Sequence, residues 1–334
     1  MNAASEVSNI LEVEDLRAHL FTKRGVVRAV DGVSFDLRRG ETLGIVGESG
    51  SGKSMTALSI VRLLPKPAGR IVSGSVKFNG TDLLSKSDDE MRRIRGQQIS
   101  MILQDPQTSL NPVFPIFSQI REAFGRSTRG TRAEDRERVV QLLRDVQIAA
   151  PESRVNCYPH ELSGGMKQRV VGAIAIASEP KIMIADEPTT ALDLTIQLQY
   201  LELLKWIKKE NRLSMVFITH DFGVVAHMCD RVAVMYAGKV VEFGSVLDIF
   251  DEPQHPYTKA LIDSLPRLDQ IGADRLPSIA GAPPLPWKLP EGCPFHPRCP
   301  HAMKRCAESY PPTATGTGRT DAAHRVACWL HRSS

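Results

Sequence analysis

The chain has 334 residues, of which 42% are hydrophobic and 24% charged, as in a globular protein with one large domain plus an appendage, or two domains. The net charge is only +4 and the basic residues are scattered, which argues against a nucleic-acid partner. No apolar run approaches the ~18 residues of a membrane-spanning helix, and the acidic segment Met1 to Asp15 lacks the positive region of a signal peptide. We therefore expect any membrane association to come through a partner.

Short strands dominate the first hundred residues. Alternation of apolar and polar residues predicts one half-buried strand, and apolar runs predict others. The predicted strands are Val33–Leu37, Thr42–Val46, Gly74–Phe78 and Ile99–Leu103. The third ends at Asn79-Gly80, a typical hairpin turn. A glycine-rich loop follows the second and leads into a predicted helix, Ser54–Leu64.

From about residue 106 to about 180 the pattern is helical. Thr131 and Glu134 have the spacing of a capping box and precede an amphipathic run to Val146. Strands resume with Ile182–Ala185 and Met215–Thr219. The last predicted strands, Arg231–Tyr236 and Lys239–Phe243, flank Ala237-Gly238 and so indicate a hairpin.

Apolar strands that alternate with helices predict an α/β fold with a mostly parallel sheet covered on both faces. Ligands of such sheets gather at the carboxyl ends of the strands. Gln104, Asp186-Glu187 and His220 each follow an apolar strand directly. We therefore expect a polar site at one edge of the sheet.

Residues 47–54, GESGSGKS, match the phosphate-binding pattern G-x-x-x-x-G-K-[ST] between a strand and a helix. Its glycines permit N–H groups to converge on phosphate oxygens, at the positive end of the helix that follows. Lys53 should bridge the β- and γ-phosphates, and the Ser54 hydroxyl should bind Mg²⁺. A chance glycine-rich turn is the alternative. The predicted nucleotide contacts are Gly47, Ser49, Gly50, Ser51, Gly52, Lys53, Ser54 and Met55.

Two carboxylates end the apolar run Ile182–Ala185. Asp186 is placed to hold Mg²⁺ or its water shell. Glu187 is placed to accept a proton from the water that attacks the γ-phosphate, which predicts a general base. A solvated acidic turn is the alternative interpretation.

A second glycine motif, LSGGMKQR, covers residues 162–169. Ser163, Gly164 and Gly165 open a helix, and a helix N-terminus of this kind predicts a second anion site. The two glycine motifs and Asp186-Glu187, in this order, resemble the ATP-binding subunit of an ABC transporter. The resemblance implies that Ser163, Gly164 and Gly165 contact ATP bound to a partner subunit, in a head-to-tail dimer.

The resemblance also implies roles for single residues. Gln104 resembles the glutamine that senses Mg²⁺ and the attacking water, so Gln104 is also a candidate Mg²⁺ ligand. His220 resembles the switch histidine that contacts the γ-phosphate, and Ala191–Asp193 resembles the loop at the dimer seam, which makes Asp193 a candidate nucleotide contact. Phe21 is the candidate for stacking on adenine, although a core phenylalanine is the alternative.

Residues 104–112 and 255–261 resemble the ATP-binding subunits of bacterial dipeptide and oligopeptide importers. This resemblance implies an ABC ATPase core with an antiparallel β subdomain and an inserted helical subdomain at about 106–180. It implies a place on the cytoplasmic face of two permease subunits, with residues 105–112 facing them, a second ATPase subunit and an external solute-binding protein. Nickel or another small solute is the alternative cargo. A less favoured alternative is a soluble ABC ATPase that acts on nucleic acid or the ribosome. A P-loop kinase or GTPase is a third alternative, but it would leave residues 162–169 unexplained.

Composition changes near residue 254, after which prolines crowd the chain. We predict an ATPase domain at 1–254 and a C-terminal domain at 255–334. Four cysteines of the latter, spaced C-x5-C-x6-C-x21-C, suggest metal, because ATP chemistry places the chain in the cytosol, where disulfides are rare. A [4Fe–4S] cluster fits four thiolates and the importer resemblance, with zinc or unligated thiols as alternatives. The predicted ligands are Cys293, Cys299, Cys306 and Cys328.

Overall fold

A computed structural model describes residues 8–105, 109–125, 128–190, 192–265, 278–316 and 324–331. The chain divides into two compact units. The first unit comprises Met1–Ile10, Leu37–Thr42 and Ser85–Ile218, and the second comprises Leu11–Asp36, Leu43–Leu84 and Thr219–Ser334. In the described ranges, no helix has both the length and the apolar character needed to cross a membrane.

The first unit contains three parallel strands in the order β8-β7-β6. They are β6 (Ile99–Ile102), β7 (Ile182–Asp186) and β8 (Ser214–Thr219). Every residue of β7 and β8 is buried, as expected of parallel strands covered on both faces. Ile182 lies opposite both Ile99 and Ser214, so the carboxyl ends of the three strands point the same way.

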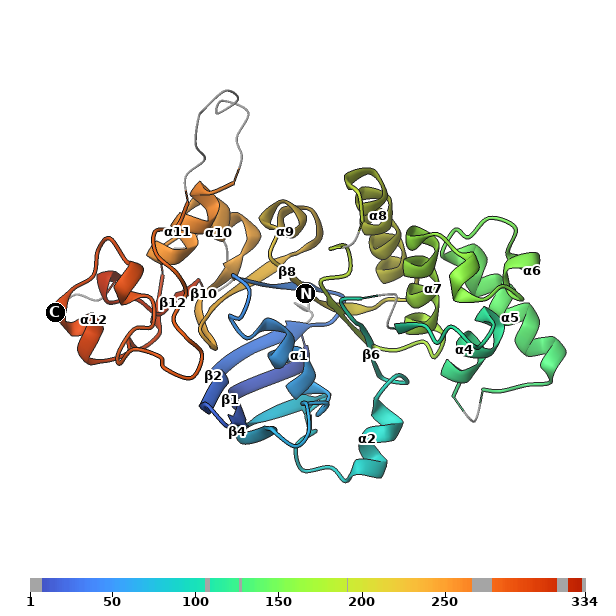
Figure 1. Cartoon of the computed structure of the whole chain (residues 1–334), viewed down its shortest axis with the longest axis horizontal. Coiled ribbons are helices and arrows are strands. Elements are labelled where there is room, and N and C mark those ends of the chain that lie inside the picture. Colours follow the sequence, from blue (N-terminus) through green and yellow to red (C-terminus); the bar gives the residue numbers. More distant parts are fainter. Residues whose placement is uncertain are drawn as a thin grey trace, which may run out of the picture. The chain divides into compact units, whose positions relative to one another are not determined.

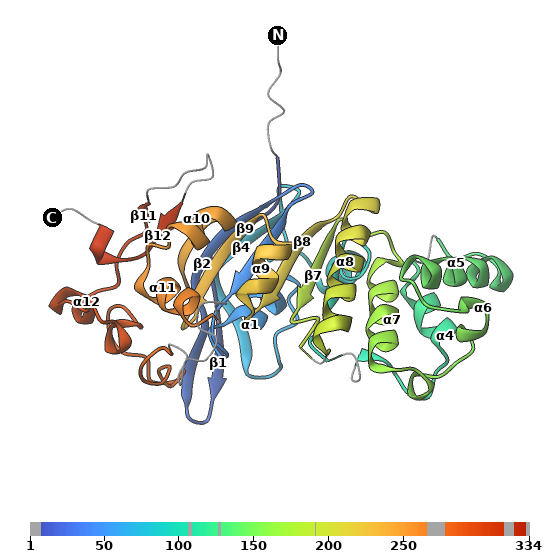
Figure 2. The same ribbon diagram turned by 90° about the horizontal axis from the view of Figure 1, so that it is seen from above.

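Helices make up the rest of the first unit. They are α2 (Asp88–Ile94), α4 (Ile116–Ala123), α5 (Arg132–Asp145), α6 (Pro151–Arg154), the 3-10 turn η1 (Pro159–Glu161), α7 (Gly164–Ile176) and α8 (Leu194–Glu210). The predicted capping box of Thr131 and Glu134 is confirmed at the start of α5. Helices α4 to α7 lie between β6 and β7 in the sequence, in agreement with the predicted helical block. They pack together in space (Figure 2).

The second unit contains an antiparallel sheet in the order β2-β1-β4-β5, of which Figure 1 labels β2, β1 and β4. Its strands are β1 (Asn9–Thr22), β2 (Gly25–Arg38), β4 (Gly69–Phe78) and β5 (Thr81–Asp82). The sequence predicted only the last part of β2 and of β4, and it missed β1. Gly74 has a φ of +100°, and a Cβ there would lie 2.6 Å from the Asp15 carbonyl oxygen, so only glycine fits beside the register shift of β1.

The second sheet of this unit has the order β11-β12-β10-β9-β3, in which β3 and β9 are parallel. Its strands are β3 (Thr42–Val46), β9 (Arg231–Tyr236), β10 (Lys239–Ser245), β11 (Ala314–Thr315) and β12 (Arg325–Val326). The predicted hairpin of β9 and β10 is confirmed. The helices and 3-10 turns are α1 (Lys53–Ile60), α9 (Phe222–Met228), α10 (Val246–Asp251), α11 (Pro256–Asp263), η3 (His296–Arg298), α12 (Lys304–Glu308) and η4 (Trp329–His331).

One apolar cluster joins distant segments of the second unit. Tyr236 of β9, Tyr257 of α11 and Phe295 lie in it beside Val46 of β3. The ring centroid of Tyr236 lies 4.7 Å from that of Tyr257 and 5.2 Å from that of Phe295, and both ring pairs are edge-to-face. Each such pair contributes roughly 0.5–1.5 kcal/mol beyond the area that it buries. The predicted boundary between residues 254 and 255 stays a prediction.

The buried His255 should make folding stability depend on pH. Burial lowers the pKa of its imidazole to about 4, from an ordinary value of 6.5. Between these values the unfolded chain binds a proton that the folded chain excludes, so the free energy of unfolding should fall as the pH is lowered from about 6.5 to 4. The loss is at most about 3 kcal/mol.

Chemical denaturation of the wild type and of His255→Asn across this range measures the effect. The imidazole Nδ1 accepts from the Tyr257 N–H (3.0 Å) and so caps α11, a role that Asn keeps without titrating. The variant should therefore lose less stability on acidification than the wild type. Equal slopes for both proteins would rule His255 out as the source.

Candidate nucleotide-binding site

The phosphate loop lies between β3 and α1 in the second unit. Gly47 (φ +151°) and Gly52 (φ +105°) meet backbone so closely that a Cβ would lie 2.2 Å from the carbonyl oxygens of Met235 and Ala29 respectively. Gly50 has a φ of +79° and open space around its Cβ position. The loop therefore requires glycine at two positions for close packing and favours it at the third for backbone conformation.

The polar groups of this loop suit a phosphate. Lys53 is buried, and its Nζ donates to the carbonyl oxygens of Gly47 (2.8 Å) and Glu48 (3.1 Å). No side chain caps the start of α1, whose N-cap is Gly52. The buried Ser51 hydroxyl has no hydrogen-bond partner in the described ranges. A cation, an uncapped helix start and an orphaned hydroxyl in one loop are features from which anion sites are built. Ser54, the predicted Mg²⁺ ligand, is partly exposed on the first turn of α1.

The β9–β10 turn supports the phosphate loop from behind. The Gly238 N–H donates to the Ser51 carbonyl oxygen (2.8 Å), and the Gly238 carbonyl oxygen accepts from the Asp31 N–H (2.8 Å). A Cβ at Gly238 would lie 2.5 Å from the Arg28 carbonyl oxygen. Strand β2, this turn and the loop are therefore fixed to one another by backbone contacts.

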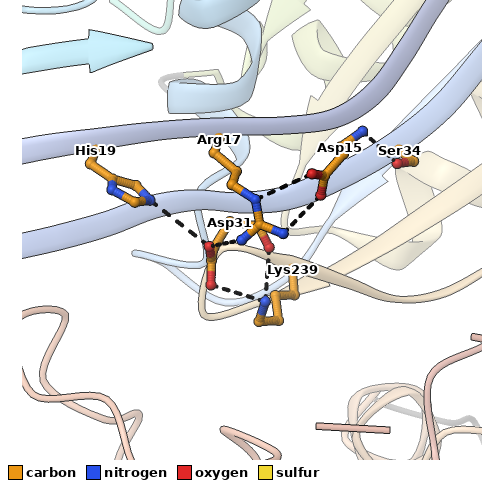
Figure 3. Close-up of polar contacts among 6 residues, drawn as sticks. All are labelled: Asp15, Arg17, His19, Asp31, Ser34 and Lys239. Atoms are coloured by element: carbon orange, nitrogen blue, oxygen red, sulfur yellow. Dashed lines mark hydrogen bonds and ion pairs between the residues drawn. The ribbon is translucent and has the colours of Figure 1, made fainter. Parts of the chain in front are cut away.

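A charged network holds the same turn (Figure 3). The Asp31 carboxylate accepts from Arg17 Nη1 (2.6 Å) and pairs with Lys239 Nζ (2.9 Å). Arg17 also donates to Asp15, and His19 Nε2 lies 3.9 Å from Asp31. Burial acts to raise the pKa of Asp31, but the hydrogen bond from Lys239 and the nearby cations outweigh it, so the pKa is lowered. Asp31 thus stays ionised and anchors Lys239 beside the turn.

Glu187, the predicted general base, ends up beside Gln104 in the first unit. Gln104 Nε2 donates to Glu187 Oε2 (3.0 Å), and Thr190 Oγ1 donates to the same oxygen (3.1 Å). The backbone of Glu187 is left-handed (φ +46°), and its N–H donates to the Ile218 carbonyl oxygen (2.9 Å). Strained backbone of this kind is frequent at functional sites. The preceding Asp186 is buried at the end of β7.

The second glycine motif begins α7, as its sequence predicts. The Ser163 side chain accepts from the Met166 N–H (3.3 Å) and so caps the helix. Ser163 and Gly164 are exposed, and the Cβ position of Gly164 is open. Gly165 faces Ile196 of α8, 3.1 Å from its Cβ position. An exposed helix start with room beside it can accept an anion from outside the chain.

The remaining predicted contacts are Phe21 and His220 in the second unit and Asp193 in the first. Phe21 is 45% exposed, so the alternative of a core phenylalanine is disfavoured, and the Arg70 guanidinium lies 5.3 Å from its ring centroid. His220 is exposed directly after β8. The Asp193 carboxylate caps α8 by accepting from the N–H groups of Thr195 and Ile196. Residue 191 of the predicted seam loop, and residues 106–108 of the segment expected to face a permease, lie outside the described residues.

Four residues that contact the predicted site groups were not singled out from the sequence. Gln168 Nε2 donates to the Pro188 carbonyl oxygen and so joins α7 to the turn after Glu187. Thr190 holds the Glu187 carboxylate. Tyr257 and Arg298 contact Glu48 of the phosphate loop. Gln168 lies within residues 162–169 and Tyr257 within residues 255–261, so both could have been suspected, whereas no sequence pattern marks Thr190 or Arg298.

The prediction of an iron–sulfur cluster is wrong. Within the described ranges, no group of three or more His, Cys, Asp or Glu side chains is placed to hold a metal ion, which also leaves the zinc alternative without a site. Instead, Cys293 and Cys306 are buried in the apolar cluster of Tyr236, Tyr257 and Phe295. Burial raises the pKa of the Cys293 thiol to about 11.

Comparisons with known proteins agree with the loop and the fold. The family model described as "ABC transporter" matches residues 30–190, and "Oligopeptide/dipeptide transporter, C-terminal region" matches residues 241–306. The chain is 51% identical to the dipeptide transport ATP-binding protein DppD of Bacillus subtilis over 324 residues, 97% of this chain and 95% of that protein. It is 48% identical to the oligopeptide transport ATP-binding protein OppD of Salmonella typhimurium over 316 residues, 95% and 93% of the two chains.

Solved structures give the same class of fold. The ATP-binding cassette MJ0796, in a dimeric post-hydrolysis state with ADP and Pi, matches with a TM-score of 0.63 at 27% identity, over 71% of this chain and 98% of that one. CbiO1 of Clostridium perfringens, part of the ABC transporter complex cbiONQ, matches with a TM-score of 0.63 at 28% identity, over 79% and 97%. The fold and the phosphate loop are therefore those of an ABC-transporter ATP-binding cassette, as the sequence predicted. Within that class, the chain belongs to the family of dipeptide and oligopeptide transport ATP-binding proteins.

Proposed function

We propose that this chain binds and hydrolyses ATP to drive the import of di- or oligopeptides through an ABC transporter. One observation in each unit carries the ATPase part: Lys53 is buried in a glycine-rich loop of the second unit, and Gln104 orients the Glu187 carboxylate in the first. The peptide cargo is supported by the relatives, which are dipeptide and oligopeptide transport proteins. Nickel or another small solute is the competing cargo.

The residues divide the chemistry of ATP hydrolysis among them. The backbone of residues 47–52 and Lys53 bind the phosphates, and the Phe21 ring stacks on the base. The Ser54 hydroxyl, Gln104 and Asp186 hold the Mg²⁺ that accompanies ATP and offsets its charge. Glu187 accepts the proton of the attacking water.

Other residues connect ATP to its surroundings. His220 contacts the γ-phosphate. Ser163, Gly164 and Gly165 bind the ATP of a second, similar subunit, and Asp193 lies at that seam. The open Cβ position and exposed backbone of Gly164 support this role. We further propose that the chain is attached to two permease subunits at the cytoplasmic face of the membrane and receives solute from a binding protein.

Reconstitution with the permease and second ATPase subunits in liposomes tests the proposal. Binding protein loaded with a mixed di- and oligopeptide library should raise the rate of ATP hydrolysis, and the peptides should accumulate inside the liposomes. Lys53→Ala should abolish both effects, since it removes the cation of the phosphate loop. Stimulation by nickel or another small solute, with no response to any peptide, would reject the peptide cargo. Equal ATPase rates for wild type and Lys53→Ala would reject the ATPase assignment.

A further inference from the structure

Glu48 places an acidic side chain inside the phosphate loop. It follows Gly47 directly, and its carbonyl oxygen accepts from Lys53 Nζ (3.1 Å). A carboxylate in an anion-binding loop disfavours ATP binding, because it repels the phosphates. The repulsion is strong where the charges are close together and partly shielded from water. The loop therefore needs something that offsets this charge.

Arg298 supplies the compensating positive charge. It lies in the C-terminal segment, residues 255–334, far from Glu48 in the sequence. Its Nη1 and Nη2 donate to the two carboxylate oxygens of Glu48, at 2.7 and 3.1 Å, so the pair is bidentate. The Arg298 side chain is 4% exposed and that of Glu48 is 26% exposed. The two residues are 250 positions apart in the sequence.

The guanidinium is itself held in a fixed position. Arg298 Nε donates to the Ala280 carbonyl oxygen (3.1 Å), and Nη1 also donates to the Tyr236 hydroxyl (3.3 Å). The Tyr257 hydroxyl accepts from the Glu48 N–H (2.8 Å), so the C-terminal segment binds both the side chain and the backbone of Glu48. With its carbonyl bound by Lys53, every polar group of Glu48 has a partner.

We propose that Arg298 is a positioning residue for ATP binding: it neutralises Glu48 and turns this carboxylate away from the phosphates. The inference rests on the proposed ATPase function and adds the C-terminal segment to the machinery that binds ATP. Loss of Arg298 should leave an unpaired carboxylate in the loop and weaken binding through repulsion. The effect should grow with the negative charge of the nucleotide and shrink at high salt.

Isothermal titration of the full-length chain with the non-hydrolysable analogue AMP-PNP, in the presence of Mg²⁺, tests the proposal. Arg298→Ala should raise the Kd by about 10-fold or more at low salt, as expected when one partner of a shielded charge pair is removed. The loss should be smaller for ADP, which has fewer charges. In a Glu48→Gln background, where no carboxylate remains, Arg298→Ala should change the Kd by no more than about 2-fold.

A matched control separates this effect from general damage to the C-terminal segment. Arg305 Nη2 donates to the Trp329 carbonyl oxygen (2.9 Å) and packs on the Trp329 ring, without any described contact to the loop. Arg305→Ala should keep the wild-type Kd. Should Arg298→Ala fail to fold, Arg298→Lys in both backgrounds replaces it, with a smaller loss that Glu48→Gln again removes.

The outcomes are distinct. A folded Arg298→Ala or Arg298→Lys protein with the wild-type Kd would overturn the proposal, as would an equal loss in the Glu48→Gln background or for ADP and AMP-PNP alike. A wild type that binds no AMP-PNP, or a Kd that Lys53→Ala leaves unchanged, would instead overturn the proposed ATPase function.

Discussion

Replacement of Glu187 by Gln should lower ATP hydrolysis by about two orders of magnitude or more, because the amide keeps the shape of the carboxylate but cannot accept a proton. ATP binding should persist, since the phosphate loop is untouched, and the ATP-bound dimer should accumulate. The rate of phosphate release by the assembled complex measures the first effect, and size-exclusion chromatography with ATP measures the second.

Glu187→Asp is the matched variant for this test. It keeps the charge but shortens the side chain by one methylene, so the hydrogen bonds from Gln104 (3.0 Å) and Thr190 (3.1 Å) should be lost or lengthened. We expect an activity between those of the wild type and Glu187→Gln. Near-normal hydrolysis by Glu187→Gln in the assembled complex would show that another group is the base.

Ser163→Arg should lower hydrolysis by the assembled complex about 100-fold, while ATP binding by the isolated chain stays nearly unchanged. The long side chain would occupy the open space beside Gly164 and keep a partner's phosphates from the helix start, whose dipole contributes to charge stabilisation. The measurements are the Kd of the isolated chain for ATP and the turnover of the complex.

Ser163→Ala provides the control. It removes the hydroxyl that accepts from the Met166 N–H but adds no bulk, so it should cost about 1 kcal/mol of helix stability and have a smaller effect on turnover. Were Ser163→Arg to weaken ATP binding in the isolated chain, the motif would act on the nucleotide of its own subunit.

Local patterns were sufficient for much of the fold. The hairpin of β9 and β10 and the capping box at Thr131 rest on residues within a few positions of one another, and both are confirmed. Strand β1 was missed: it includes Asp15, at a left-handed φ of +44°, and the register shift beside Gly74. Such a bulge interrupts the alternation of apolar and polar residues that identifies a strand.

The site shows the same limit. The loop between β3 and α1 and the place of Asp186 at the end of β7 could be predicted, because both follow from residue types at short spacing, whereas their roles stay predictions. The contact of Arg298 with Glu48 could not be predicted, since it depends on a tertiary approach across 250 positions. The prediction from the four cysteines was wrong for a related reason. Their spacing suggests that they bind one metal centre, whereas Cys293 and Cys306 are apolar core residues.

The aromatic cluster of Tyr236, Tyr257 and Phe295 has a consequence for protein engineering and for gene recombination. Two relatives should not be able to exchange residues 255–334 as an independent module, because Tyr257 and Phe295 complete a core that also contains residues of β3 and β9. A chimera joined near residue 254 would have to preserve this packing and also the pairing of residues 48 and 298. Replacing only the helical segment between β6 and β7, by two crossovers, should be tolerated better, because both sides of these contacts then come from the same parent.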